Sequence, residues 1–245
     1  MGNTSSKNEE AFLDDNLMLT LIGRLADESV ENRYAAQMEL QDIASNASKP
    51  GHEAARKALG KRLAAKAADP SVPQPARVWI VRQLEYMGRD EAVKALAGVM
   101  NGDDAELREC ARRALEKNPA RAATSSLRDA LKKANDAAWK IGLMNSLGEH
   151  GDARSVKLIA EGLDDPKTAP AAALALGKIA NDAAVEALWG AFGKLPEAGE
   201  ALIHAANRLQ AKSDSAAKAI YQRLAEQAQA DSLRTAGRFG LEQVK

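Results

Sequence analysis

A leucine near the end of every second predicted helix recurs at a nearly constant interval along the chain. From Leu84 onward, successive members are separated by 31, 32, 29, 33 and 32 residues. Leu40 stands 44 residues before Leu84, so we place an insertion in the loops at 45–52 (SNASKPGH) and 69–75 (DPSVPQP). A fixed period in this range is typical of repeat proteins, in which each unit buries its apolar face only against its neighbours. The members of the column are Leu40, Leu84, Leu115, Leu147, Leu176, Leu209 and Leu241.

Each period has the pattern of two amphipathic helices joined by a short turn. Apolar residues follow the column leucine at offsets of 9, 12 and 16, as in Val156, Ile159 and Leu163 after Leu147, and this spacing places them on one helical face. The chain is 45% hydrophobic but only 4% aromatic, so its core must consist mainly of small and aliphatic residues. We therefore predict an all-α fold, a right-handed α-α solenoid (superhelix) of about seven helical hairpins. Residues 11–245 are expected to form one domain after a disordered leader at 1–10.

The stretch from 147 to 188 shows most clearly the residues that mark helix starts and ends in each repeat. It contains Leu147-Gly148, Asp152, Asp165-Pro166 and Leu176-Gly177. This pattern resembles HEAT repeats, and in particular the short HEAT-like repeats of the phycobiliprotein-lyase type. The resemblance covers about residues 16–245 and implies a fold without naming a function. Glycines that follow helix-end leucines are predicted to be helix C-caps, namely Gly88, Gly148 and Gly177.

A column of basic residues lies seven positions before five of the seven column leucines, with Ala169 and Leu202 interrupting it. An acidic residue stands a few positions upstream of each basic one. The resemblance implies that the two pair within and between repeats, where a guanidinium bridges carboxylates and open carbonyls. A track that binds anions is the alternative interpretation. The basic residues are Arg33, Arg77, Arg108, Lys140 and Arg234, and the acidic residues are Asp27, Asp69, Asp103 or Asp104, Asp136 and Asp231.

The sequence contains no constellation of residues that indicates catalysis or metal binding. The three histidines fall in different repeats, and Cys110, the only cysteine, has no histidine nearby in sequence, so it is predicted to be structural. HEAT-like deoxyhypusine hydroxylases hold a di-iron centre with several His-Glu pairs, whereas this chain has only His52-Glu53. No glycine-rich phosphate loop occurs. We therefore predict a protein that is not an enzyme and that holds no metal or cofactor.

A candidate binding surface follows from the resemblance, because the second helices of HEAT hairpins line the concave side of the array. The positions two and five residues before the column leucines should face outward there. Aromatic and arginine residues among them are typical of binding hot spots; packing between repeats is the alternative for Trp79, and is the favoured interpretation for Trp139 and Trp189. The predicted partner-binding residues are Trp79, Arg82, Arg113, Asn145, His204 and Asn207.

These features favour a non-catalytic scaffold that binds another protein or peptide in a concave groove. The first alternative is a cofactor- or chromophore-handling subunit of the lyase or chaperone kind. The second is a nucleic-acid-binding HEAT-like protein, which is disfavoured because 34 basic and 34 acidic residues cancel. No run of residues is apolar enough for a membrane span. We expect a monomer in the cytoplasm; export, with a signal peptide already removed, is the alternative.

Overall fold

The structure is a computed structural model that describes residues 15–211 and 214–244. Over these ranges the chain forms fourteen α-helices in seven consecutive pairs, and two short 3₁₀ segments, with no β-strand. The all-α repeat of helical hairpins predicted from the sequence is confirmed. The expected leader at 1–10 lies outside the described residues.

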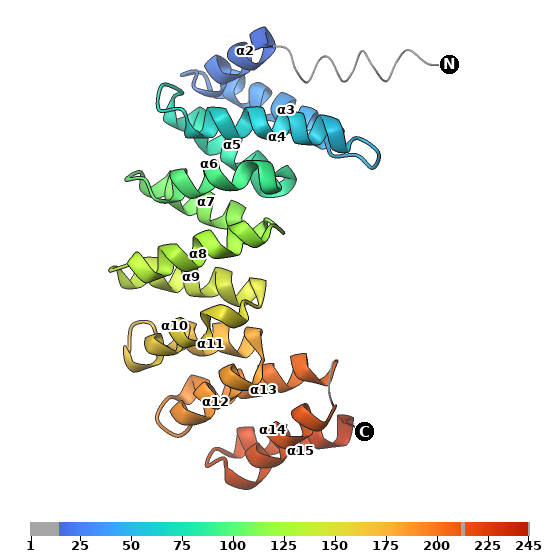
Figure 1. Ribbon diagram of the computed structural model, residues 1–245, viewed down its shortest axis with the longest axis vertical. Coiled ribbons are helices and arrows are strands. Elements are labelled where there is room, and N and C mark those ends of the chain that lie inside the picture. Colours follow the sequence, from blue (N-terminus) through green and yellow to red (C-terminus); the bar gives the residue numbers. More distant parts are fainter. Residues whose placement is uncertain (1–14, 212–213, 245) are drawn as a thin grey trace. The chain divides into compact units, whose positions relative to one another are not determined.

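The chain divides into two compact units, residues 1–126 and residues 127–245, with the boundary inside one helix. We call them unit 1 and unit 2 and describe each by itself. The expectation of a single domain at 11–245 stays a prediction. Within each unit, successive helices run back and forth and each hairpin lies beside the next (Figure 1).

Unit 1 contains three complete hairpins. The first helices α4 and α6 pack against each other, and the second helices α5 and α7 pack against each other in a separate layer, with α3 beside α5. The helices are α2 (Asp15–Leu25), α3 (Val30–Ala47), α4 (Glu53–Ala68), α5 (Gln74–Met87), α6 (Asp90–Met100) and α7 (Ala105–Lys117), followed by α8 (Arg121–Lys133), which crosses the boundary.

Unit 2 continues the same arrangement. Its second helices α9, α11 and α13 pack in sequence, and α14 packs against both α13 and α15. The first helix of one hairpin is broken into two 3₁₀ turns around a short α-helix. The elements are α9 (Ala137–His150), η1 (Ala153–Ser155), α10 (Val156–Ala160), η2 (Glu161–Asp164), α11 (Ala169–Ile179), α12 (Asp182–Ala191), α13 (Pro196–Gln210), α14 (Asp214–Gln227) and α15 (Asp231–Gln243).

The leucine column forms the centre of the core in most repeats. Leu40, Leu84, Leu115, Leu147 and Leu176 are each at most 1% exposed. The last two members, Leu209 and Leu241, are only half-buried. In α13 the fully buried leucine is instead Leu202. The sequence period therefore identifies the helices correctly, but near the C-terminus it selects leucines that are not the most buried ones.

Short polar side chains start several helices. Ser29, Asp104, Asp136 and Asn181 each accept a hydrogen bond from the backbone N–H three residues later, which satisfies a donor that the first helical turn leaves open. The loop predicted at 45–52 begins later than expected, because α3 continues to Ala47. The insertion before Leu84 therefore lengthens a helix as well as a loop.

The glycines after the column leucines have two different roles. Gly88 is the C-cap of α5, as predicted, and its N–H donates to Leu84 O. The C-cap prediction is wrong for Gly148 and Gly177, which lie inside α9 and α11. A Cβ at Gly148 would lie 2.9 Å from Ala175 Cα, and one at Gly177 would lie 2.8 Å from Ala201 O. These glycines therefore allow neighbouring second helices to meet backbone against backbone.

Candidate functional site

A groove of about 1080 Å³ crosses the second-helix layer of unit 1. It is formed by α3, α5 and α7, which belong to three successive hairpins. On α5 and α7 the lining residues follow one another at helical spacing, so each helix presents a single face to the groove. The lining residues are Gln41, Ala44, Ser45, Ser48, Lys49 and Pro50 from α3 and its following loop, Trp79, Arg82, Gln83, Glu85, Tyr86 and Met87 from α5, and Glu106, Glu109, Cys110 and Arg113 from α7.

One wall of the groove is made by the insertion that interrupts the repeat period. Ala44 to Pro50 lie after Leu40, in the part of α3 and its loop that lengthens this interval to 44 residues. The end of α3 is closed by Ser48, whose N–H and Oγ both donate to Ala44 O, so the wall is a regular, capped helix end. The irregularity in the sequence period therefore supplies part of the site.

Trp79 and Arg82 form the centre of the α5 face. The indole Nε1 of Trp79 donates to Gln37 O of α3 at 3.3 Å, which fixes the half-buried ring against the neighbouring hairpin. The guanidinium carbon of the exposed Arg82 lies 5.5 Å from the centroid of that ring, in a cation–π contact. Trp79 therefore packs between repeats and also lies beneath a cation in the groove; its role in binding stays a prediction.

Three carboxylates line the groove, and each has a partner. The buried Glu85 accepts from Arg113 Nη2 at 3.3 Å. Glu109 accepts two hydrogen bonds from Arg112, at 2.8 and 2.5 Å. Glu106 accepts from Gln74 Nε2 at 2.9 Å. The acidic side chains are therefore held by interactions within unit 1.

Cys110 lies on the α7 face of the groove, half-buried. Burial raises the pKa of its thiol above the ordinary value, and the neighbouring Arg82 offsets only part of that rise. Because the thiolate is the reactive form of cysteine, a raised pKa leaves this residue a poor nucleophile at neutral pH. The structural role predicted for Cys110 stays a prediction.

The structure brings together three of the six predicted binding residues. Trp79, Arg82 and Arg113 all line the groove in unit 1. Sequence reasoning missed the exposed Tyr86, the three carboxylates and the wall contributed by α3. The long interval between Leu40 and Leu84 was the signal that could have located that wall.

The other three predicted residues belong to unit 2. Asn145 lies on α9, and its Oδ1 is buried with no hydrogen-bond partner in the described part of the chain. His204 and Asn207 lie on α13. Asn207 Oδ1 accepts from Tyr221 Oη at 2.5 Å, and burial raises the pKa of that tyrosine. Their role in binding stays a prediction.

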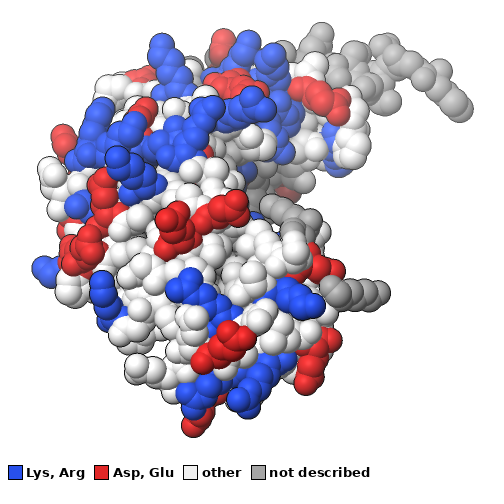
Figure 2. Space-filling view, turned by 60° about the horizontal axis from the view of Figure 1, so that its bottom comes forward, with Lys and Arg blue, Asp and Glu red and all other residues white. Residues whose placement is uncertain are grey.

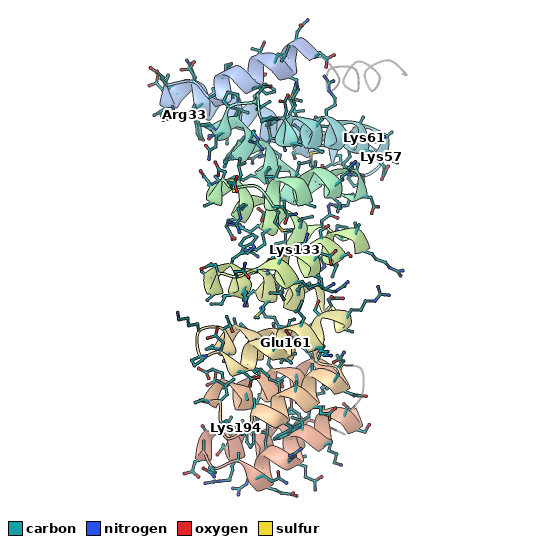
Figure 3. All side chains as sticks on the ribbon, turned by 60° about the vertical axis from the view of Figure 1, so that its left-hand side comes forward. Arg33, Lys57, Lys61, Lys133, Glu161 and Lys194 are labelled. Atoms are coloured by element: carbon teal, nitrogen blue, oxygen red, sulfur yellow. The ribbon has the colours of Figure 1, made fainter. Side chains whose placement is uncertain are left out.

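The basic column mainly closes helix ends. Arg33, labelled in Figure 3, donates to Asp27 O and Glu28 O beyond the end of α2. Arg77 donates to Ala67 O near the end of α4, and Arg234 donates to Ala228 O and Gln229 O beyond α14. These carbonyls lack helical partners. The acidic pairing that the resemblance implied is found for Arg234 with Asp231, whereas Asp27 accepts from Ser29 N and Asn32 Nδ2.

Trp189 packs between hairpins, as predicted. Its ring meets Phe192 edge to face at a centroid distance of 5.0 Å, and Arg223 of α14 lies 4.1 Å above it.

Two further findings concern residues 15–211 and 214–244. They contain no group of three or more His, Cys, Asp or Glu arranged to hold a metal ion. None of their helices is long and apolar enough to cross a membrane.

The face shown in Figure 2 carries both signs of charge. Lys and Arg predominate in the upper part of that view, with Asp and Glu among them, and the two signs alternate below. Lys57 and Lys61, labelled in Figure 3, are exposed on α4 and do not line the groove. Substitutions that reverse the charge of these lysines would therefore not alter the lining of the groove.

Comparisons with known proteins find similarity only among solved structures. No model of a protein family matches the sequence, and no curated protein matches it. The complex of CpcE and CpcF of phycocyanin lyase from Nostoc sp. PCC7120 is similar at 21% identity and a TM-score of 0.48, covering 92% of this chain and 93% of that chain. Human deoxyhypusine hydroxylase is similar at 17% identity and a TM-score of 0.37, with 98% of each chain covered. A designed armadillo repeat protein in complex with the peptide (KR)4 is similar at 16% identity and a TM-score of 0.42, covering 92% of this chain and 98% of that chain. No TM-score among these three reaches 0.5, so the likeness assigns no ligand or activity to this chain.

Proposed function

We propose that unit 1 binds a segment of a partner protein in the groove across α3, α5 and α7. The observation that carries this proposal is the position of Trp79, Arg82, Tyr86 and Arg113 along a groove of about 1080 Å³. Tryptophan, tyrosine and arginine are the residue types that contribute most to binding energy at protein interfaces.

The groove is suited to an extended segment because residues of three consecutive hairpins line it. It crosses three consecutive hairpins, so a bound chain would contact each of them in turn. Trp79 is held by its bond to Gln37 O, and a side chain that is already ordered loses little entropy on binding. Tyr86 is 76% exposed, which leaves its ring available to a partner.

The test is selection of binders from a displayed library of random peptides. The double variant Trp79→Ala with Arg113→Glu should lose the peptides that the natural sequence selects, with binding weakened about 100-fold by truncation of two central contacts. The charge change Lys61→Glu, on α4 outside the groove, is the matched control and should bind as the natural protein does. Circular dichroism must show that the double variant remains helical. Equal binding by a folded double variant would place the binding site elsewhere.

A second candidate is a cofactor-sized molecule as the occupant of the same groove. The volume of about 1080 Å³ supports it, because it lies just above the range of about 300–1000 Å³ that is common for small-molecule sites. A lyase- or chaperone-like subunit of this kind would bind a chromophore together with a partner protein. Titration of the protein with biliverdin is the test: a shift in absorbance that the double variant lacks would support this candidate, and an unchanged spectrum would reject it for this chromophore.

A further inference from the structure

We infer that the segment bound in the groove is acidic and that Arg82, assisted by Arg113, binds one of its carboxylates. This inference rests on the proposed function, since it names the chemistry of the partner at the same site. It follows from which charges in the groove already have partners and which do not.

Arg82 is a cation of the groove that is available to a partner. Its guanidinium lies over Trp79 and beside the Cys110 thiol, and no carboxylate of the described residues pairs with it at ion-pair distance. The side chain is exposed. A guanidinium has five donors in a planar fork that fits a carboxylate with two parallel hydrogen bonds. The cation–π contact holds this fork in place without occupying its donors.

Arg113 lines the same groove as Arg82 and is only partly engaged. The two arginines are 31 residues apart, the same interval as the column leucines of α5 and α7, so they occupy equivalent positions on neighbouring helices. Arg113 makes a single contact of 3.3 Å with Glu85, and its side chain remains 56% exposed. A carboxylate placed between the two helices can therefore meet donors from both arginines.

The carboxylates of the groove do not offer an equal site for a basic segment. Glu85 is buried and held by Arg113, and Glu109 is bonded twice by Arg112. Arg112 is only 10% exposed at its side chain and is also held by Glu116, so the charge of Glu109 is balanced by a cation fixed on the same helix. Lys49 adds a further exposed cation at the α3 wall. Among the described residues, the exposed Glu106 has the neutral Gln74 amide as its partner and no cation. Two cations without an ion-pair partner, Arg82 and Lys49, therefore stand against one such carboxylate, and charge complementarity favours an acidic partner.

A nucleic acid fits the same arginines less well than an acidic peptide does. A phosphate backbone carries a charge on every nucleotide, and successive phosphates would have to pass Glu85, Glu106 and Glu109. A peptide can place one carboxylate at Arg82 and apolar or aromatic side chains against Trp79 and Tyr86. The mixed lining therefore matches a segment in which acidic and apolar residues occur together.

The experiment is the peptide-library selection with the sequences of the binders as the readout. Peptides selected by the natural protein should be enriched in Asp and Glu and depleted in Lys and Arg relative to the starting library. The variant Arg82→Glu should bind the selected peptides about 10-fold or more weakly, since it replaces an attractive charge contact by a repulsive one. Arg82→Lys should restore only part of the affinity, because an ammonium lacks the planar fork. Lys61→Glu should leave the selection unchanged.

The other outcomes separate the inference from the function it rests on. If the library yields peptides that depend on Trp79 but are not enriched in acidic residues, the acidic inference fails and the groove proposal stands. If no peptide is selected in a manner that depends on Trp79, both fail. If single-stranded DNA binds instead, with an affinity that Arg82→Glu abolishes and that falls steeply with salt, the occupant is a nucleic acid and the inference is overturned.

Discussion

The residue directly after the column leucine differs between α3 and α5 of unit 1 and α9 and α11 of unit 2. In unit 1 this residue is Gln41 after Leu40 and Glu85 after Leu84, and both line the groove. In unit 2 it is Gly148 after Leu147 and Gly177 after Leu176, and both glycines meet the backbone of the next second helix.

This difference shows how one repeat can give either a lined groove or a close contact between second helices. A glycine that faces an alanine lets two helices approach until no space remains between them. A long polar side chain at the same place, together with the lengthened α3, leaves room along the helices of unit 1. A smaller pocket of about 140 Å³ does occur in unit 2, beside Met144 and Gly162, but a volume of that size is too small for a peptide segment.

The first-helix layers of the two units, in contrast, are alike. In each layer a half-buried or buried ion pair links successive repeats. In unit 1, Arg56 Nη1 donates to Glu91 Oε1 at 2.6 Å and to Met87 O at 2.9 Å. In unit 2, Arg128 Nε donates to Asp152 Oδ2 at 2.9 Å. The side-chain exposures are 17% and 3% for the first pair and 16% and 10% for the second.

The largest expected effect tests whether these two links are equivalent. Arg56→Leu in unit 1 and Arg128→Leu in unit 2 should each lower the free energy of unfolding by about 3 kcal/mol, because each leaves a buried carboxylate without its partner. Urea denaturation followed by circular dichroism measures both.

The matched control for that pair is Arg24→Leu. Arg24 pairs with Glu39 at side-chain exposures of 35% and 40%, so the same substitution should cost under about 1 kcal/mol. If one buried variant behaves like this control and the other does not, the two first-helix layers are not held together in the same way.

The link in unit 1 also predicts a dependence of stability on pH. Burial acts to raise the pKa of Glu91, but the hydrogen bond from Arg56 and those from backbone N–H groups outweigh it, so the pKa lies below its ordinary value of 4.5. A carboxyl with a lowered pKa stabilises the fold fully above the unfolded value and loses that contribution as the pH falls through the folded value. The difference in unfolding free energy between the natural protein and Arg56→Leu should therefore shrink as the pH is lowered from neutral to about 3.

Denaturation series at several pH values measure this effect, with Arg24→Leu as the reference. A difference for Arg56→Leu that stays constant down to the acid end of the range would contradict the assigned role of Arg56 in lowering the pKa of Glu91.

The next effect concerns the glycines that close the second-helix layer of unit 2. Gly177→Ala should destabilise the protein by about 2 kcal/mol, because the added methyl group would lie 2.8 Å from Ala201 O, on backbone that cannot move aside. The same substitution at Gly190 in α12, or at Gly98 in α6 of unit 1, meets no atom within 4 Å. There it should stabilise by about 0.5–1 kcal/mol through helix propensity alone.

Thermal and urea denaturation of the three variants measure these signs. If Gly177→Ala proves as stable as Gly190→Ala, the second helices of unit 2 are not in close contact, and the comparison between the two layers loses its physical basis.

The sequence predicted the hairpins well because the column leucines and short polar caps act locally. It did not predict which glycines end helices. Gly88 stands four residues after Leu84 and Gly148 directly after Leu147, and the role of Gly148 depends on the neighbouring helix, whose Ala175 it contacts. It found Trp79, Arg82 and Arg113 by counting from the leucines. It missed Tyr86 and the α3 wall because that count assumes equal repeats, whereas the wall arises where the repeats are unequal. Near the C-terminus the same count selected Leu209 over the fully buried Leu202.

The smallest effect concerns how the second helices end. In unit 1, α5 and α7 end at residues with extended backbone, Gly88 and Asn118. In unit 2, α9 and α11 end in the left-handed region, at Gly151 with φ of 63° and at Ala180 with φ of 49°. The left-handed conformation costs an alanine about 1–2 kcal/mol, and a glycine there would remove that strain.

Ala180→Gly should nevertheless change the unfolding free energy by less than about 0.5 kcal/mol, because relief of strain is offset by a more flexible unfolded chain and by the loss of a methyl group that is 7% exposed. Ala171→Gly, inside α11, has no strain to relieve and should cost about 1 kcal/mol. Urea denaturation of the two variants measures the difference between them. Equal losses would mean that Ala180 is not strained and that α11 ends as the helices of unit 1 do. If Ala180→Gly is neutral and Ala171→Gly is destabilising, unit 2 tolerates backbone strain at the end of α11. The close packing of its second helices then fixes the direction in which the chain leaves that helix.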